Sequence, residues 1–171
     1  YRAVVATDTR AGEPGEPGDP GDELVDVIDG DDRAVRVVTR REMRRDRLRH
    51  RCTFVVVRSS RGEVLIHRRS DDKDMWPGRW DLACGGVVAS GEEWVDAARR
   101  ELCEELGIDG VELRELTAGS YIDYDVDEVT RAWEVTSDGP FDFTDDEVVE
   151  ARFVSLEELE RRLIEDSFVP D

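Results

Sequence analysis

Residues 86–108 have the sequence GVVASGEEWVDAARRELCEELGI, and most inferences about the chain depend on them. Glu101, Glu104 and Glu105 are spaced i, i+3 and i+4, so a helix of about 3.6 residues per turn places their carboxylates on one face. Three like charges at this spacing repel each other. Mg²⁺ or Mn²⁺, which prefer hard oxygen ligands, would relieve that repulsion. The pattern therefore predicts a divalent-metal site on a helix.

The same stretch predicts the bounds and the buried face of that helix. It should run from about residue 92 to residue 106, with Ser90 as its N-cap and Gly107 as the C′ residue that ends it. An apolar stripe beside the carboxylates consists of Val95, Ala98, Leu102 and Leu106. Because this stripe can pack on a sheet, we expect the carboxylates at the edge of the buried face rather than in bulk water.

The complete pattern resembles a known family motif. Gly86, Glu92 and the run from Arg100 to Ile108 match the Nudix box, G-x5-E-x7-R-E-U-x-E-E-x-G-U, at every defined position. Flanking segments are similar to Nudix hydrolases close to isopentenyl diphosphate isomerase, over roughly residues 23–165. They are VDVIDGDDRAVRVV, RLRHRCTFVVV, GEVLIHRRSDDKDMWPGRWDLACGGVV and DDEVVEARFVSLEEL. This resemblance implies an α+β Nudix fold, an α/β/α sandwich around a mixed β-sheet, with an N-terminal β-hairpin extension.

The resemblance also implies a mechanism, hydrolysis of a diphosphate linkage by a water molecule activated by one to three Mg²⁺ ions, with Mn²⁺ as a substitute. The implied metal ligands are Gly86, Glu101, Glu104 and Glu105. A glycine lets its backbone carbonyl approach a metal ion closely. The base is expected to be Glu101 or Glu147, which precedes the last strand, and Glu150 is the next candidate. Glu104 and Glu105 complete the predicted catalytic set.

Basic residues outside the box are candidates for contacting substrate phosphates. Arg68 and Arg69 follow a predicted strand and precede the loop that enters the site, where relatives place such residues. Seven arginines lie between residues 40 and 51, and they form either a solvated helix face or an anion-facing patch at the mouth of the site. Trp76 and Trp80 are expected mainly in packing, with stacking on substrate as the alternative.

The remaining sequence predicts a tail and one domain. Residues 1–22 repeat Pro and Gly among acids and are expected to be a flexible acidic tail, followed by a single domain over 23–171. A hairpin is expected around the Gly-Asp-Asp turn of LVDVIDGDDRAVRVV. Further expected elements are a helix at about 40–47, two strands around Ser-Ser-Arg-Gly, strands at 111–119, 121–126 and 128–136, a last strand in DDEVVEARFV, and a helix after Ser155.

Composition limits the partners. The formal net charge of the 171 residues is −19, from 24 basic and 43 acidic residues, which excludes bulk electrostatic binding of nucleic acid. No apolar run approaches the roughly 18–20 residues that a membrane span needs. Cys52, Cys84 and Cys103 are odd in number and widely spaced, which favours a reducing, cytoplasmic location. The expected partner is a small-molecule diphosphate. A homodimer is compatible with the family resemblance, and the N-terminal hairpin could serve as its interface.

Two other functions stay open. An isopentenyl diphosphate isomerase needs a cysteine, a glutamate and a His-rich metal site, and His50 lies in the matching L-x-H-R context. However, Met43 and Val87 occupy positions of metal histidines, and Gly85 occupies that of the cysteine. A Nudix fold can also bind a nucleotide without cutting it, which the complete set of box glutamates argues against. The box predicts diphosphate chemistry and not the group X, so nucleoside triphosphates, nucleotide sugars, dinucleoside polyphosphates and coenzyme A derivatives all stay open.

Overall fold

A computed structural model describes residues 20–73, 75–143 and 148–170. Residues 1–19, and with them nearly all of the predicted tail, lie outside the described residues. The described elements are η1 (Pro20–Asp22), β1 (Leu24–Ile28), β2 (Ala34–Thr39), α1 (Arg40–Asp46), β3 (His50–Arg58), β4 (Val64–Arg69), β5 (Trp80–Asp81), β6 (Cys84–Val87), α2 (Trp94–Leu106), β7 (Arg114–Ile122), β8 (Asp127–Thr136), β9 (Val148–Val154) and α3 (Leu156–Glu165).

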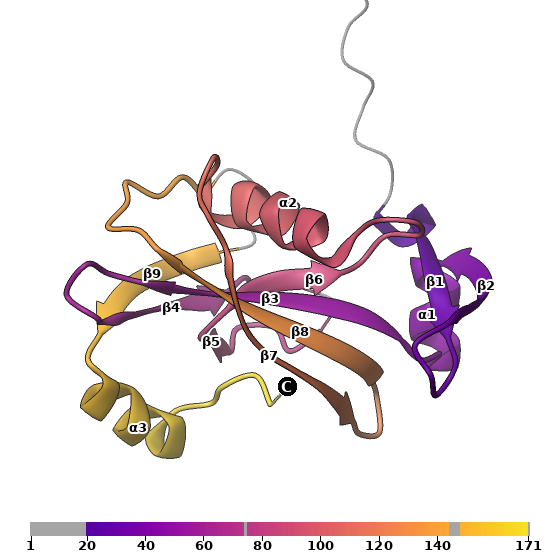
Figure 1. The fold of residues 1–171 in the computed structure, drawn as a ribbon. Helices are drawn as coiled ribbons and strands as arrows, with labels where there is room; N and C mark the ends of the chain where they lie inside the picture. Colours follow the sequence, from indigo (N-terminus) through magenta and orange to yellow (C-terminus); the bar gives the residue numbers. More distant parts are fainter. Residues whose placement is uncertain (1–19, 74, 144–147, 171) are drawn as a thin grey trace, which may run out of the picture.

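The elements form three layers, with a small extension at one end. Helix α2 covers one face of the sheet and α3 lies on the opposite side (Figure 1). The antiparallel β1–β2 hairpin and α1 stack at the end of the sheet that is far from α3. The α+β class, the α/β/α sandwich and the hairpin extension are therefore confirmed.

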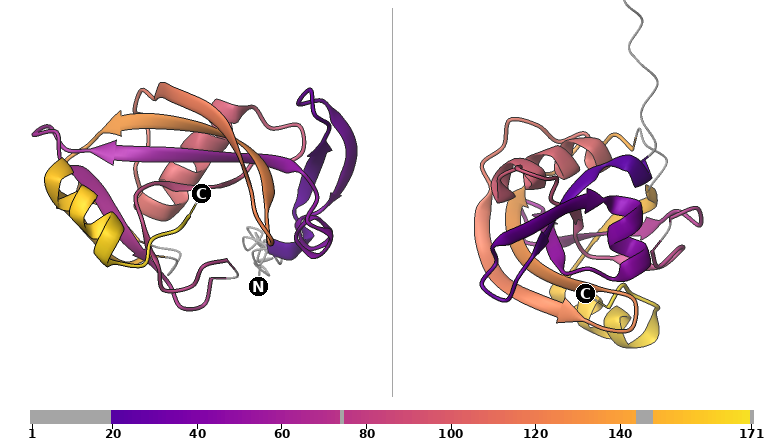
Figure 2. Two further views of the ribbon diagram at one scale, coloured as in Figure 1. Left: turned by 90° about the horizontal axis from the view of Figure 1, so that it is seen from below. Right: turned by 90° about the vertical axis from the view of Figure 1, so that its right-hand side faces the viewer.

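Strand β3 organises the mixed sheet. In the described part of the chain, seven strands share this sheet in the order β5-β4-β3-β8-β7, with β6 also paired to β3 and β9 to β4. Strand β3 runs parallel to β8 over its whole length but pairs with β4 only at Arg58 and Val64. The two strands diverge beyond this pair (Figure 2), and residues 52–55 of β3 pair instead with β6. The divergence gives the segment with Gly86 its place in the sheet.

Helix α2 packs on the sheet through small and aliphatic side chains. Ala97 and Ala98 are fully buried, and Leu102 and Leu106 are each 1% exposed. Ala98 and the two leucines contact a core that includes Val55 of β3. Burying each leucine stabilises the fold by about 1.5–3 kcal/mol. The two alanines leave little between the helix and the sheet, so the helix axis can lie close to β6.

The end of α2 agrees with the prediction, but its beginning does not. Gly107 ends the helix with a left-handed φ of 66°, as expected. The predicted N-cap Ser90 is wrong, because α2 starts at Trp94 with Glu93 as its N-cap and without a side-chain cap. The hydroxyl of Ser90 instead donates to Asp26 Oδ1 at 2.7 Å, which ties the loop before α2 to the hairpin.

The predicted strand at 121–126 is also wrong. Strand β7 continues to Ile122, and a turn follows in which Asp123 Oδ1 accepts from the backbone N–H groups of Asp125 and Val126. An aspartate that bonds the backbone two and three residues later favours a turn over a strand. The Ser155 cap of α3 is confirmed, since its hydroxyl accepts from Glu158 N.

The helix end makes a stability prediction. In Gly107→Ala, the new Cβ would lie 2.7 Å from Asp142 Cβ. The alanine would also have to adopt the left-handed φ of the glycine. We expect a loss of about 2–4 kcal/mol in the free energy of unfolding, measured by urea denaturation. Gly110→Ala is the matched control, because its φ is +67° and no atom lies within 4 Å of its Cβ. Equal losses in the two variants would contradict the steric explanation.

Candidate active site

The three box carboxylates on α2 differ in their exposure. The side chain of Glu105 is 3% exposed, that of Glu101 is 12% exposed and that of Glu104 is 54% exposed. Glu105 therefore lies on the side of α2 that faces the sheet, Glu104 lies on the solvent side, and Glu101 lies between them. This arrangement agrees with the prediction that the carboxylates lie at the edge of the buried face. Two of the three carboxylates are held in an environment where a negative charge is costly unless a cation or hydrogen bonds compensate it.

Gly86 of β6 lies directly against Glu101. Its neighbour in the sheet is Thr53 of β3. A Cβ on Gly86 would lie 2.6 Å from Glu101 Oε1 and 2.8 Å from its Cδ. Only glycine leaves room for the carboxylate here, so the glycine and the first glutamate of the helix cluster form one unit.

Arg100 holds this unit together. Its guanidinium donates to Glu101 Oε1 at 2.7 Å and to Glu104 Oε2 at 3.1 Å. It also donates to the backbone oxygen of Val87 and to both carboxylate oxygens of Glu92. The structure thereby gives Glu92 a role, which is to anchor Arg100. Burial raises the pKa of Glu101, and the charge of Arg100 opposes that rise.

A cavity of about 590 Å³ opens beside Gly86. Arg69, at the end of β4, lies on its wall and bonds Asp81 and the backbone oxygen of Met75. Lys73, which the sequence analysis did not single out, also lines the cavity, and its Nζ lies 3.5 Å from Glu105 Oε1. It is the single lysine in a chain whose other basic residues are arginines. That contrast is the signal by which it could have been found.

The arginine-rich segment also faces the cavity. Arg40, Arg41 and Arg44 of α1 line the wall. Arg40 pairs with Glu23 at 3.6 Å and Arg41 with Asp22 at 3.3 Å. Of the two interpretations of this segment, the placement of these three side chains favours the anion-facing patch.

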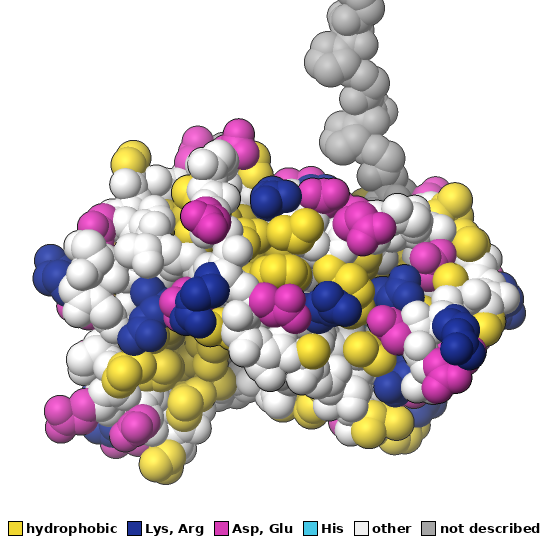
Figure 3. Space-filling model, in the orientation of Figure 1, with side chains coloured by type: hydrophobic (Ala, Val, Ile, Leu, Met, Phe, Trp, Pro, Cys, Tyr) yellow, Lys and Arg dark blue, Asp and Glu magenta, His cyan; other side chains and the backbone are white. Residues whose placement is uncertain are grey.

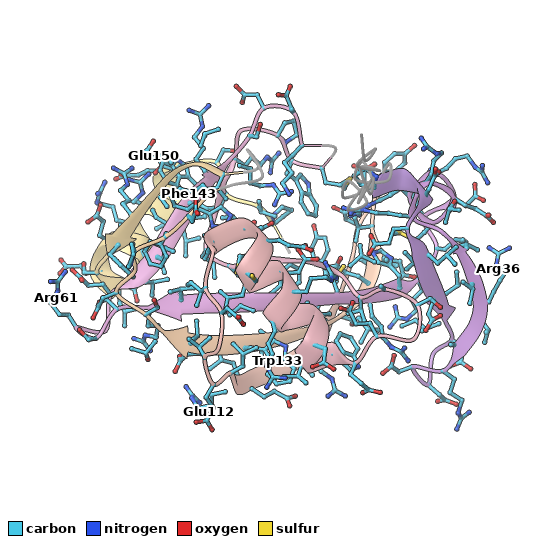
Figure 4. All side chains as sticks on the ribbon, turned by 90° about the horizontal axis from the view of Figure 1, so that it is seen from above. Arg36, Arg61, Glu112, Trp133, Phe143 and Glu150 are labelled. Carbon is cyan, nitrogen blue, oxygen red and sulfur yellow. The ribbon has the colours of Figure 1, made fainter. Side chains whose placement is uncertain are left out.

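The other predicted residues lie in different places. Arg68 donates to Gly78 O, pairs with Asp71 and is not on the cavity wall. Glu147 lies outside the described residues. Glu150 is exposed on β9 and is not on the cavity wall either, and Figure 4 shows it on the side of Phe143, away from Arg36 of the hairpin. Its part in catalysis stays a prediction.

The two tryptophans separate. Trp76 lines the cavity, where stacking on a substrate is open to it. Trp80 packs against the guanidinium groups of Arg152 and Arg162, at 4.8 and 4.6 Å from its ring centroid. The packing expected for Trp80 is therefore present.

The isomerase positions offer no room for the missing cysteine. A Cβ on Gly85 would lie 2.1 Å from the backbone oxygen of Thr53. Cys84 is buried and its thiol donates to Val55 O, and burial raises its pKa well above the usual range of a thiol. Neither residue can supply a thiolate to the cavity.

The donor set at Gly86 fits a hard divalent cation. The carboxylates of the α2 cluster and a backbone carbonyl are oxygen ligands, which Mg²⁺ and Mn²⁺ prefer. The close approach of Glu101 to Gly86 brings two of the predicted donors together. The residues present therefore fit the metal that the box implies.

The surface agrees with a small-molecule partner. On the face in Figure 3, the Lys and Arg side chains of the described residues are interspersed with Asp and Glu. This face therefore offers no broad basic field for nucleic acid. None of the described helices has the length and apolarity to cross a membrane.

Comparison with known proteins shows the family to which the chain belongs. The NUDIX domain family matches residues 48–171. The chain is 39% identical over 148 residues to the uncharacterized Nudix hydrolase YfcD of Escherichia coli K12, which covers 84% of this chain and 79% of YfcD. It is 40% identical over 135 residues to the uncharacterized Nudix hydrolase PA4841 of Pseudomonas aeruginosa, covering 76% and 77%. The crystal structure of DR0079 from Deinococcus radiodurans has a TM-score of 0.76 at 27% identity, covering 87% and 94%.

Fold and box together define a Nudix protein. The chain belongs to the Nudix family, and its enzyme class is that of the Nudix pyrophosphohydrolases. Divalent metals are general in this family. Which metal this chain uses, and what it cuts, are treated below.

The contact at Gly86 can be tested directly. In Gly86→Ala the new Cβ displaces the Glu101 carboxylate, so affinity for Mn²⁺ in isothermal titration calorimetry should fall at least about 10-fold. The end of a glutamate side chain can swing away, so the free energy of unfolding should change by less than about 1 kcal/mol. Gly119→Ala is the control, since its Cβ would meet only Thr130 Oγ1 at 3.6 Å. Unchanged Mn²⁺ affinity in Gly86→Ala would contradict the assignment.

Proposed function

We propose that the chain hydrolyses the diphosphate linkage of a nucleoside diphosphate linked to a group X, with Mg²⁺ as cofactor and Mn²⁺ as substitute. The observation that carries the proposal is the Glu101 carboxylate against Gly86, at a cavity with cationic side chains on its other walls. A diphosphate bears the negative charge that such walls attract. The carboxylates alone would repel it, so the proposal requires a cation.

In this proposal the chain's own residues hold the cation and a proton. Glu101, Glu104, Glu105 and the carbonyl of Gly86 would bind the divalent ion. When bound, such an ion neutralises charge on phosphate oxygens and makes water a stronger nucleophile. Glu101 or Glu147 accepts the proton of the attacking water, whose oxygen bonds to phosphorus as the bridging P–O bond breaks. Arg100 keeps Glu101 oriented through this step.

Cationic side chains would bind the rest of the diphosphate. Arg69, Lys73 and Arg44 of α1 all line the cavity. Charge-assisted hydrogen bonds from guanidinium groups to phosphate are short and directional. Arg68 stays a weaker candidate, because it is not on the cavity wall and Arg69 is.

The two alternatives have less support. Isomerase chemistry lacks its thiol, since Gly85 has no room for a side chain and Cys84 is buried with a raised pKa. The chain would then resemble isomerase-like Nudix enzymes in its fold but not in its reaction. A binding module that does not cut its ligand has no need for the costly burial of Glu101 and Glu105.

Location and assembly are part of the same proposal. None of the three cysteines is in a disulfide, which supports a cytoplasmic, reducing setting. A homodimer through the hairpin is supported by Val35 and Val37, which lie on one face of β2 and are 62% and 52% exposed.

Removal of single box carboxylates tests the metal assignment. Glu104→Gln and Glu105→Gln keep the shape of the side chain and remove its charge. We expect each to lower kcat on the order of 100-fold or more, in a phosphate-release screen of nucleotide sugars, dinucleoside polyphosphates, nucleoside triphosphates and coenzyme A derivatives with Mg²⁺. Glu112→Gln is the control, because its side chain points outward from the edge of the molecule (Figure 4). Full activity in both box variants would overturn the proposal, and a wild type inactive on the whole panel would favour the binding module.

If Arg69 binds a substrate phosphate, its replacement should affect KM more than replacement of Arg68 or Arg99. Arg69→Ala should raise KM by about 10–100-fold with a smaller change in kcat, because the lost interaction is a charged hydrogen bond made to bound substrate. Arg68→Ala should have a smaller effect. Arg99→Ala removes an exposed arginine that pairs with Asp96 and controls for net charge. Equal KM values for the Arg69 and Arg99 variants would rule out this role.

A further inference from the structure

A second group of ligand-type side chains lies beside the same cavity, outside the Nudix box. His50 and Cys52 are two residues apart on β3 and so share one face of the strand. Glu128 of β8 lies opposite His50 in the parallel β3–β8 register. The strand geometry thus brings an imidazole, a thiol and a carboxylate together, and their ligand atoms all lie within 4.8 Å of one another.

All three side chains are buried. His50 is 1% exposed, Cys52 is 4% exposed and Glu128 is 2% exposed. Polar and ionisable groups are buried at a cost unless hydrogen bonds, opposite charges or a metal ion compensate it. A neighbouring hydrophobic cluster includes Cys52, Met43 and Val87, so the group has an apolar wall behind it.

The imidazole of His50 is held in the form that binds metals. Its Nδ1 lies 2.8 Å from the backbone oxygen of Leu48, which can only accept, so Nδ1 carries the proton. The lone pair is then on Nε2, which is buried and has no hydrogen-bond partner among the described residues. Metal-binding histidines characteristically donate their other ring N–H to a carbonyl or carboxylate in this way.

The cluster is accessible from the cavity. Cys52 and Glu128 are both on the cavity wall, on which Gly86 also lies. A neutral imidazole, a thiolate and a carboxylate carry two negative charges in total, which matches a divalent ion. Three protein ligands leave a further coordination position, as in catalytic zinc sites.

We propose that His50, Cys52 and Glu128 bind a Zn²⁺-type transition-metal ion at a second site of this cavity. The mixed nitrogen, sulfur and oxygen donors suit Zn²⁺ or Co²⁺, whereas the oxygen donors at Gly86 suit Mg²⁺. The open position of the second ion faces the cavity and can take an oxygen atom from a ligand bound there. This site goes beyond the proposed hydrolysis, which uses the box ligands alone.

Cobalt provides a spectroscopic test that does not depend on activity. Chelator-treated protein is titrated with Co²⁺ under reducing conditions, and the near-ultraviolet thiolate-to-Co²⁺ charge-transfer absorption is recorded. We expect this absorption to saturate at one equivalent and to disappear when Zn²⁺ is added. It should be absent in Cys52→Ser and retained in Cys84→Ser and Cys103→Ser, which remove the other two thiols.

Further variants separate this site from the box. Glu104→Gln should retain the Co²⁺ absorption even if it loses hydrolysis, so the two proposals can fail independently. His50→Gln and Glu128→Gln should weaken Zn²⁺ binding at least about 10-fold. No thiolate absorption in folded wild type, or absorption that persists in Cys52→Ser, would overturn the second site. If circular dichroism shows that Cys52→Ser does not fold, the wild type together with His50→Gln decides in the same way.

Discussion

The contact between the Gly86 backbone and the Glu101 carboxylate constrains the whole site. A helix can lie this close to a strand only if the residues between them are small, and Ala97 and Ala98 of α2 meet that condition at zero exposure. The missing side chain of Gly86 leaves room for the carboxylate, while its backbone lines the cavity. A methyl group at this one position would displace the Glu101 carboxylate from the strand.

Packing the box carboxylates close to the sheet has an electrostatic cost, and neighbouring cationic residues offset part of it. Glu101 and Glu105 are mostly removed from water, and burial raises the pKa of Glu101. Arg100 offsets part of this cost by bonding Glu101, and Lys73 Nζ lies 3.5 Å from Glu105 Oε1. The chain as a whole keeps a net charge of −19, so these two cations do not neutralise it. They act locally, where a carboxylate, a backbone carbonyl and a bound phosphate would otherwise repel each other.

The parts that were predictable from sequence are those set by local rules. The period of α2 and its glycine stop at Gly107 depend on residues within a few turns of one helix, and the box spacing can be read from one continuous stretch, residues 86–108. Ser90 failed as a cap because its hydroxyl bonds Asp26, which is 64 residues away. Lys73 and the His50–Glu128 pair depend on loop placement and on the parallel β3–β8 register, which no local pattern encodes. Tertiary contacts between distant segments therefore account for what the sequence left open.

Strand β3 lies between the two sets of donors that we propose as metal ligands. Its odd-numbered residues Val55 and Val57 face the core under α2, whereas Cys52 and Phe54 line the cavity on the other face. The box carboxylates come from α2, and Glu101 lies against Gly86, whose backbone lines the cavity. The nitrogen and sulfur donors come from β3 itself. Because hard and borderline cations differ in their preferred ligands, the two sets would not compete for one ion.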